Sequence, residues 1–375
     1  MFTDKTESKA MDKKPMTYAE SGVDYAPIDA FKRLAQQAAQ ETAKASHVHG
    51  ESAFSFEATE KYLAHVEEGL GTKNLIADAM YRYTGKSYYD SIAKDTVASI
   101  VNDMITIGAF PQSITMHLAA GSSEWFRDKH RYQQLIEGWK NASIESDSVW
   151  AGGETAVLAD IIRPDHVMLG GSAVGALSEK NNIAQCKIAD DDAIILIESS
   201  GVHANGITLA RRIAEKIPDG YLTKLSNNRT FGEVLLDPAI IYVGLIRELL
   251  YAGIDIHYAV NITGHGWRKL MRGKTSQRFS YIIEYLPNQQ LIFDFLQEHG
   301  PISDREAYGN FNMGAGFAIY TPQSDVKRVF EILHSPKNRN KYTALHAGNI
   351  FAGNDTRVVI TPKNITFTAD ELQIR

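Results

Sequence analysis

The stretch IILIESSGVHANGITLARRIAEK, residues 194–216, places an apolar run, a small polar turn and an amphipathic segment in direct succession. Residues 194–197 predict a buried strand, because they are consecutive apolar residues followed by turn-forming ones. The segment that follows has Ala210, Ile213, Ala214 and Ile217 on one helical stripe, with charged residues on the other side. The stretch therefore predicts a strand, a Gly/Ser turn and the start of a helix.

Two interpretations of this turn are open. The first N–H groups of a helix have no intrahelical partner and the helix dipole favours negative charge, so the turn could bind an anion such as phosphate. The alternative is an ordinary connection in which the asparagine, Asn205, caps the helix. The local sequence does not decide between them.

Length and composition restrict the class of protein. The chain has 375 residues, of which 44% are hydrophobic and 22% charged, so we expect a soluble globular protein of two domains. A net charge of −6 gives no electrostatic reason to expect nucleic acid as a partner. The single cysteine, Cys186, excludes an internal disulfide framework and fits a reducing, cytoplasmic location. No apolar run reaches the roughly 18 residues of a membrane-spanning helix.

Strands and helices are mixed in both halves without regular βα alternation, which favours an α+β fold with helices on one face of each sheet. We expect a flexible tail at 1–16, an N-terminal domain at 17–178 and a C-terminal domain at 179–375, because the polar segment 180–192 resembles a crossing between domains. Helices are predicted at 26–45, 91–107, 124–141 and 238–251, a further helix is predicted to be capped by Ser324, and residues 46–58 are predicted to form a loop.

The predicted helix 91–107 carries polar residues on two sides. Asp103 falls inside its apolar arc, where a carboxylate needs a cation or hydrogen-bond donors. It is either a locally paired helix-edge residue or a carboxylate of a metal or phosphate site. Asp95 and Asn102, seven residues apart, fall on the opposite side, which we interpret as a solvated face.

Two glycine-containing stretches could handle phosphate and metal. EEGLGTK, residues 67–73, has a Gly-x-Gly turn that would let N–H groups approach a phosphate, with Lys73 to neutralise it, although the spacing is not that of a Walker A loop. AGGETAV, residues 151–157, puts Glu154 after a glycine pair. Glu68, Asp103 and Glu154 would together suit Mg²⁺, which prefers oxygen ligands. Ordinary turns remain the alternative for each stretch. The histidines His47, His49, His203 and His265 have no zinc-site spacing.

The order of the motifs is more specific than any one of them. Along residues 17–360 the series resembles the aminoimidazole ribonucleotide synthetase (phosphoribosylformylglycinamidine cyclo-ligase) family. The motifs that carry the resemblance are YAESGVD (18–24), EEGLGTK (67–73), VNDMITIGAFP (101–111), GGETA (152–156), SSGVHANG (199–206), LLDPAIIYV (235–243), NITGHG (261–266) and FNMGAGF (311–317).

The resemblance implies an ATP-dependent ring closure in purine synthesis, in which ATP phosphorylates an amide oxygen and an amidine nitrogen then displaces phosphate. It also implies Mg²⁺ as a cofactor, a small phosphoribosyl substrate, no nucleic-acid or membrane partner, and a homodimer built largely from the sheets of the N-terminal domains. Both domains would have the α+β fold of that family.

The resemblance also assigns roles to residues by position. Catalytic roles fall to Lys73, Asp103 and His203, and Mg²⁺ would be held by Glu68, Asp103 and Glu154. The nucleotide would be contacted by Gly69, Gly71, Thr72, Lys73, Asn102, Gly152, Gly153 and Thr155. The substrate side would consist of Ser199, Ser200, Gly201, His203, Asn205, Gly206, Thr263, Gly264 and Gly266.

Several positions depart from the family pattern. The usual T-D-G-V-G-T-K has Glu67 and Glu68 in its first two positions here, and Glu68 has a longer arm than aspartate. A Gly/Phe-rich loop is replaced by SHVHGESAFSF at 46–56, His265 stands at the third glycine of T-G-G-G, and Val202 stands at a proline. Two alternatives therefore stay open: an ATP-using paralogue acting on another small substrate, and a non-catalytic nucleotide- or metabolite-binding protein.

Overall fold

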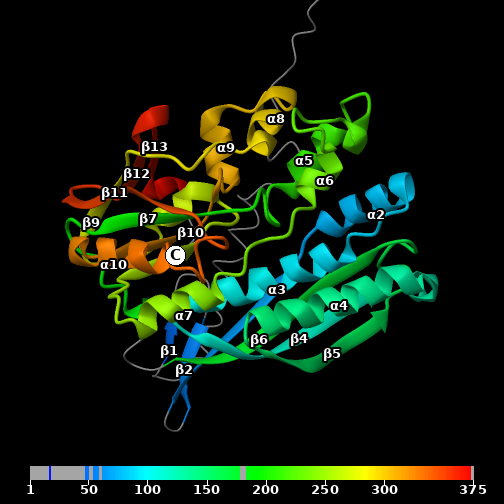
Figure 1. Cartoon of the computed structure of the whole chain (residues 1–375), viewed down its shortest axis with the longest axis horizontal. Helices are drawn as coiled ribbons and strands as arrows, with labels where there is room; N and C mark the ends of the chain where they lie inside the picture. The colour runs from blue at the N-terminus through cyan, green and yellow to red at the C-terminus, as the bar shows by residue number, and fades with distance from the viewer. Residues whose placement is uncertain (1–16, 18–46, 50–53, 59–60, 178–182, 373–375) are drawn as a thin grey trace, which may run out of the picture.

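The protein forms two β-sheets with helices packed beside them (Figure 1). The computed structural model describes residues 17, 47–49, 54–58, 61–177 and 183–372. The expected α+β class is confirmed, because each sheet mixes parallel and antiparallel strands and packs against helices. The predicted tail 1–16, the predicted helix 26–45 and the expected boundary at 178/179 lie outside the described residues.

The first sheet lies low in Figure 1 and has the order β1-β2-β3-β6-β4-β5. Its only parallel pair among the described strands is β4 with β5. The loop predicted at 46–58 is wrong, because this segment contains two antiparallel strands that extend the sheet. The strands are β1 (His47–His49), β2 (Phe54–Ala58), β3 (Lys61–Gly69), β4 (Phe110–Ala120), β5 (Val149–Val157) and β6 (Val167–Leu177).

Two helices pack on one face of this sheet, namely α3 (Tyr89–Ile105) and α4 (Lys129–Glu145), and α2 (Lys73–Thr84) packs against α3. The apolar arc predicted for the helix at 91–107 is confirmed, since Val97, Ile100 and Met104 are completely buried. The helix predicted at 124–141 is α4, which begins at Lys129 and not at residue 124. A 3-10 turn (Ser123–Arg127) comes first, and Asp128 then accepts a hydrogen bond from the N–H of Arg131.

The second sheet has seven strands in the order β13-β12-β9-β11-β7-β10-β8. The apolar run of the opening stretch is β7, and its first five residues are buried between β11 and β10, as a fully covered strand requires. The strands are β7 (Ala193–Glu198), β8 (Tyr258–Asn261), β9 (Arg278–Ile283), β10 (Ala315–Thr321), β11 (Ala344–Gly353), β12 (Arg357–Ile360) and β13 (Ile365–Thr368).

Helices of the second half correct three sequence predictions. The helix predicted at 238–251 begins only at Val243, so residues 238–242 are not helical. The last long helix begins after Pro322, which takes the capping position expected for Ser324. The helices are α5 (Ile207–Ala214), α6 (Phe231–Leu235), α7 (Val243–Tyr251), α8 (Leu291–His299), α9 (Asp304–Asn310) and α10 (Gln323–Leu333).

The turn before α5 gives the third correction. Gly206 caps the helix in the left-handed conformation at φ 73°, and no side chain caps it, so the Asn205 cap is wrong. A Cβ atom on Gly206 would lie 2.1 Å from the ring of Phe311. Glycine is therefore required at this position both by its backbone angles and by the neighbouring ring.

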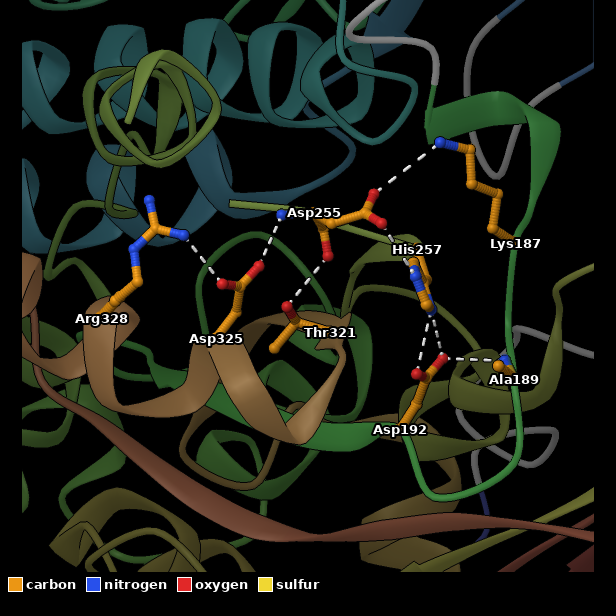
Figure 2. A network of polar contacts seen from close by, with 8 residues as sticks. All are labelled: Lys187, Ala189, Asp192, Asp255, His257, Thr321, Asp325 and Arg328. Carbon is orange, nitrogen blue, oxygen red and sulfur yellow. Dashed lines mark hydrogen bonds and ion pairs between the residues drawn. The ribbon is translucent and has the colours of Figure 1, made fainter. Parts of the chain in front are cut away.

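A polar network fixes the start of the second domain (Figure 2). The carboxylate of Asp192 accepts a hydrogen bond from the N–H of Ala189 at 2.8 Å and contacts Nδ1 of His257 at 2.8 Å. Nε2 of His257 lies 3.2 Å from Asp255, whose N–H donates to Asp325 of α10 at 2.9 Å. The segment leading into β7 is thereby joined to the residues before β8 and to α10.

Across the described residues, no helix combines the length and apolar character needed to span a bilayer.

Candidate active site

The Gly-x-Gly turn joins the end of β3, an interior strand of the first sheet, to the start of α2. Gly71 has a φ of 77°, and a Cβ atom at Gly69 or Gly71 would meet open space, so both backbones face a free volume. The N-cap Thr72 makes no capping hydrogen bond. Its Oγ1 atom is buried and has no hydrogen-bond partner among the described residues. Exposed glycine backbone, a helix N-terminus and an unpaired hydroxyl together suit an anionic group.

Lys73 does not point into this volume. Its side chain is fully buried, and Nζ forms an ion pair with Asp95 of α3 at 2.7 Å. Nζ also donates a hydrogen bond to the carbonyl of Asp237 at 3.0 Å. Burial raises the pKa of Asp95, while the nearby Lys73 ammonium and the N–H of Ala239 oppose the shift. The lysine predicted to face phosphate therefore lies at the contact between the two domains.

The polar side of α3 is an interface and not the solvated face that we expected. Asp95 and Asn102 are 0% and 2% exposed. Oδ1 of Asp95 accepts the N–H of Ala239 at 2.8 Å. Asn102 accepts the N–H of Tyr242 at 3.0 Å and donates to the carbonyl of Ile240 at 2.8 Å. The solvated-face interpretation is wrong because the second domain covers this side of the helix.

Asp103 is buried, as its position in the apolar arc predicts. It is 6% exposed, and its Oδ1 accepts a hydrogen bond from Asn261, at the end of β8, at 2.7 Å. Figure 1 shows why this is possible, since α3 lies between its own sheet and the second domain. The carboxylate thus stands where the two domains meet.

The Ser-Ser-Gly turn lies directly across the interface. Ser200 Oγ donates to the carbonyl of Pro238 at 2.6 Å, next to the carbonyl that Lys73 contacts. Ser199 Oγ donates to Asn312 at 3.0 Å, and the amide of Asn312 donates to the carbonyl of Gly201 at 2.8 Å. These contacts fix the turn from both sides.

His203 is buried within the same turn and lies beside Tyr242. Its Nε2 accepts the N–H of Ser200 at 3.2 Å, which leaves the proton of the neutral ring on Nδ1. Burial lowers the pKa of His203 to about 3, and the positive charge of Lys73 adds to the effect. The imidazole is therefore neutral at physiological pH and can donate a hydrogen bond but does not gain a proton.

The turn after β8 contains His265, which stands at a position where the family pattern has glycine. Its φ of 71° lies in the left-handed region that favours glycine, and its side chain is 8% exposed. A Cβ atom on the following Gly266 would lie 2.3 Å from the carbonyl oxygen of Tyr308. Thr263 Oγ1 accepts a hydrogen bond from Lys269 at 2.9 Å, so this turn carries a buried cation close to Gly264.

The predicted magnesium ligands are only partly brought together. Glu68 pairs in register with Gly171, Met116 and Gly153 across the sheet, whereas Glu154 pairs with His117. Alternate residues point to opposite faces, so Glu68 shares the helix-covered face of buried Met116 and Glu154 points to the other face. Strand spacing also separates the two glutamates by about 14 Å. No group of three potential metal ligands occurs among the described residues.

The other predicted residues also fall into two groups, one on β5 and one in the turn after β7. Gly152, Gly153 and Thr155 are exposed on β5 with Glu154, away from the interface between the domains. Ser199, Ser200, Gly201, His203 and Asn205 lie in the single turn described above. Sequence analysis gave no site role to Asp95, Asn312 or the segment 237–242, although Asn312 and the segment lie in motifs that carry the family resemblance. The seven-residue spacing of Asp95 and Asn102 indicates that both lie on one side of the helix. It does not indicate which other part of the protein covers that side.

Two family models match the chain. One is described as "AIR synthase related protein, N-terminal domain" and matches residues 49–177, and the other is its C-terminal domain, matching residues 189–360. The phosphoribosylformylglycinamidine cyclo-ligase of Methanosarcina acetivorans is 34% identical over 337 residues, which cover 86% of this chain and 93% of that protein. The protein of the same name from Pyrococcus horikoshii is 32% identical over 85% of this chain and 92% of its own length.

Solved structures share the fold at much lower identity. Thiamine monophosphate kinase from Aquifex aeolicus has a TM-score of 0.56 at 13% identity, covering 93% of this chain and 99% of that one. The hydrogenase maturation protein HypE in complex with ATP has a TM-score of 0.58 at 12% identity, covering 84% of this chain and 85% of that one. Identities this low establish a common architecture and nothing about substrate.

Proposed function

The chain belongs to the AIR synthase related protein family, and we propose that it is the phosphoribosylformylglycinamidine cyclo-ligase of purine biosynthesis. The observation that carries the proposal is the 34% identity with a cyclo-ligase across 93% of that protein. ATP use fits the family, and a solved relative of the same fold is a complex with ATP. The chemistry is the closure of an imidazole ring on a phosphoribosyl substrate.

The reaction requires two displacements. The amide oxygen of the formyl group attacks the γ-phosphorus of ATP, and ADP leaves. The amidine nitrogen then attacks the activated carbon, phosphate leaves with the former amide oxygen, and loss of a proton completes the aromatic ring. Because no covalent enzyme intermediate is needed, the protein contributes mainly positioning and stabilisation of charge.

We assign the nucleotide side to the Gly-x-Gly turn. Free space above Gly69 and Gly71 and the unpaired hydroxyl of Thr72 support this assignment. The substrate side is assigned to Ser199–Gly201, with His203 as a neutral hydrogen-bond donor. The turn at Thr263–Gly266 would add an anion contact, with Lys269 beside it.

Mg²⁺ is the metal that we propose for Glu68 and Asp103. Asp103 is a carboxylate at the interface of the domains, Glu68 directly precedes the Gly-x-Gly turn, and oxygen ligands are what this cation prefers. Bound there, it would offset the charge of the transferred phosphoryl group. Glu154 does not complete this site within one chain, because it points to the opposite face of the sheet.

We also propose a homodimer through the first sheet. The face that carries Glu154 also carries Val149, Met168 and Val174, which are 67%, 42% and 39% exposed. Exposed apolar side chains gathered on one sheet face favour burial against a partner. Pairing two such faces would cover these residues in both copies.

The deciding experiment measures phosphate release from Mg²⁺–ATP together with formation of the aminoimidazole product. Release should depend on formylglycinamidine ribonucleotide and match the product in amount. Release that is independent of this substrate, or an ATP-induced thermal shift without product, would contradict the proposal and favour a paralogue with another substrate. The departures from the family pattern at Glu67, Glu68 and His265 are the observations that support this alternative.

A further inference from the structure

We propose that Lys73 is a positioning residue that fixes the substrate-side turn to the nucleotide-side turn through Asp95 and the segment Asp237–Tyr242, and is not a phosphate ligand. We call this segment the interdomain connector. The inference rests on the proposed function for its substrate, but its central test, nucleotide binding, does not require cyclisation.

The contacts of Lys73 leave little of it for a nucleotide. The side chain is 0% exposed, and its ammonium contacts the Asp95 carboxylate at 2.7 Å and the carbonyl of Asp237 at 3.0 Å. Its backbone, in contrast, starts α2 directly after the Gly-x-Gly turn. The residue therefore belongs to the nucleotide turn by its main chain and to the domain interface by its side chain.

The connector is held by polar contacts along its whole length. On the side of the first domain, Asp95 accepts from the N–H of Ala239, and Asn102 contacts the carbonyl of Ile240 and the N–H of Tyr242. Within the second domain, the hydroxyl of Tyr342 contacts the carbonyl of Ile241 at 3.2 Å. The path of the connector is thus set by peptide groups and not only by apolar packing.

The same segment holds the substrate-side turn. Ser200 Oγ donates to the carbonyl of Pro238 at 2.6 Å, and the hydroxyl of Tyr242 donates to the carbonyl of Glu198 at 2.8 Å. Lys73 and Ser200 consequently contact adjacent carbonyls, one from each side. A displacement of Lys73 is therefore expected to displace Ser200.

Charge balance makes the role testable. A buried ion pair that loses one member leaves an uncompensated charge, whereas removal of both members restores neutrality. Asp95 should thus be harmful to a variant that lacks the lysine charge. A lysine that bound phosphate would lose its function in the double variant as completely as in the single one.

The experiment compares Lys73→Met, Asp95→Asn and the double variant. It measures the Kd of AMPPNP with Mg²⁺, the melting temperature, and kcat and KM for formylglycinamidine ribonucleotide. In Lys73→Met we expect the AMPPNP Kd to change by less than about threefold and kcat/KM for the substrate to fall by about 30-fold or more. The double variant should recover about tenfold of that loss and part of the lost melting temperature.

A matched control is Lys94→Met on α3, the helix that carries Asp95. Lys94 pairs with Glu145 at 2.8 Å but is 30% exposed, so its loss should change none of these quantities appreciably. An AMPPNP Kd that is weakened about tenfold or more in both lysine-73 variants would show a phosphate ligand and overturn the inference.

If the double variant recovers its melting temperature but not its kcat/KM, Lys73 has only a structural role, and this result would also overturn the inference. If the wild type forms no product, the proposed function fails. The AMPPNP Kd then still decides whether Lys73 contacts the nucleotide.

Discussion

Asp103 illustrates how far a single residue can be predicted. Its place in the apolar arc of α3 required a partner, and the structure supplies Asn261 at 2.7 Å. The partner itself could not be predicted, because it lies 158 residues away on another sheet. In the same way, the substrate-side turn could be located from its Ser-Ser-Gly sequence, whereas the neutral state of His203 follows only from its burial.

Asp103→Asn is expected to reduce Mg²⁺–ATP turnover by about tenfold or more without unfolding the protein. The variant keeps an oxygen that can accept from Asn261, but it loses the charge proposed to face Mg²⁺. Steady-state turnover at saturating Mg²⁺ and a melting curve test this. Asp90→Asn, at an exposed position on the same helix, is the control. Wild-type turnover in folded Asp103→Asn would remove Asp103 from the metal site.

His257 predicts a pH dependence of stability that is separate from catalysis. The hydrogen bond to Asp192 raises the pKa of His257, and the charges of Asp192 and Asp255 act in the same direction. A raised folded-state pKa stabilises the protein fully below the unfolded pKa of about 6.5, and this contribution is lost as the pH rises through the folded value.

We therefore expect the free energy of unfolding of the wild type to exceed that of His257→Gln by more at pH 6 than at pH 8. The difference between the two pH values should be on the order of 1 kcal/mol. Urea unfolding of both proteins at each pH measures it. Lys187, 3.7 Å from Asp255, is the nearby cation (Figure 2) and keeps its charge over this range. An equal gap at both pH values would contradict the assignment.

At the scale of elements, α3 is a helix that packs against both domains. Its apolar arc could be predicted from periodicity, because burial against its own sheet follows from the local sequence. The burial of its polar side could not be predicted, because a polar face covered by another domain and a polar face exposed to solvent have the same sequence pattern. The connector was also mistaken for the first turn of α7. Its peptide groups bond to α3 and to Tyr342 in place of forming a helical turn.

Asn102→Ala should lower the free energy of unfolding by about 3 kcal/mol, because it leaves the carbonyl of Ile240 and the N–H of Tyr242 without their partner. Denaturant unfolding measures the change. Asn141→Ala, at an exposed position on α4, should change stability by less than about 0.5 kcal/mol. A similar small effect at Asn102 would mean that water replaces its contacts and that the interface is looser than described.

At the scale of the whole molecule, the proposed dimer concerns the face of the first sheet that the helices leave uncovered. Val174→Glu places a charge on the exposed sheet face that also carries Met168, where burial of the charge would be unfavourable. We expect the wild type to be a dimer and Val174→Glu a monomer by size-exclusion chromatography with light scattering. Tyr285→Glu, at a 64% exposed position in the second domain, should stay dimeric. A monomeric wild type would contradict the proposed dimer.

The distance along the chain between the two sides of the connector interface bears on how the protein is made. The contacts of Lys73, Asp95 and Asn102 with the connector span 138–164 residues. A ribosome adds roughly 5–20 residues per second, so the first domain waits many seconds before its covering segment emerges. During that time α3 presents carboxylate and amide groups to water, where an apolar interface would invite aggregation. We therefore expect the polar character of this surface to limit aggregation of the nascent chain.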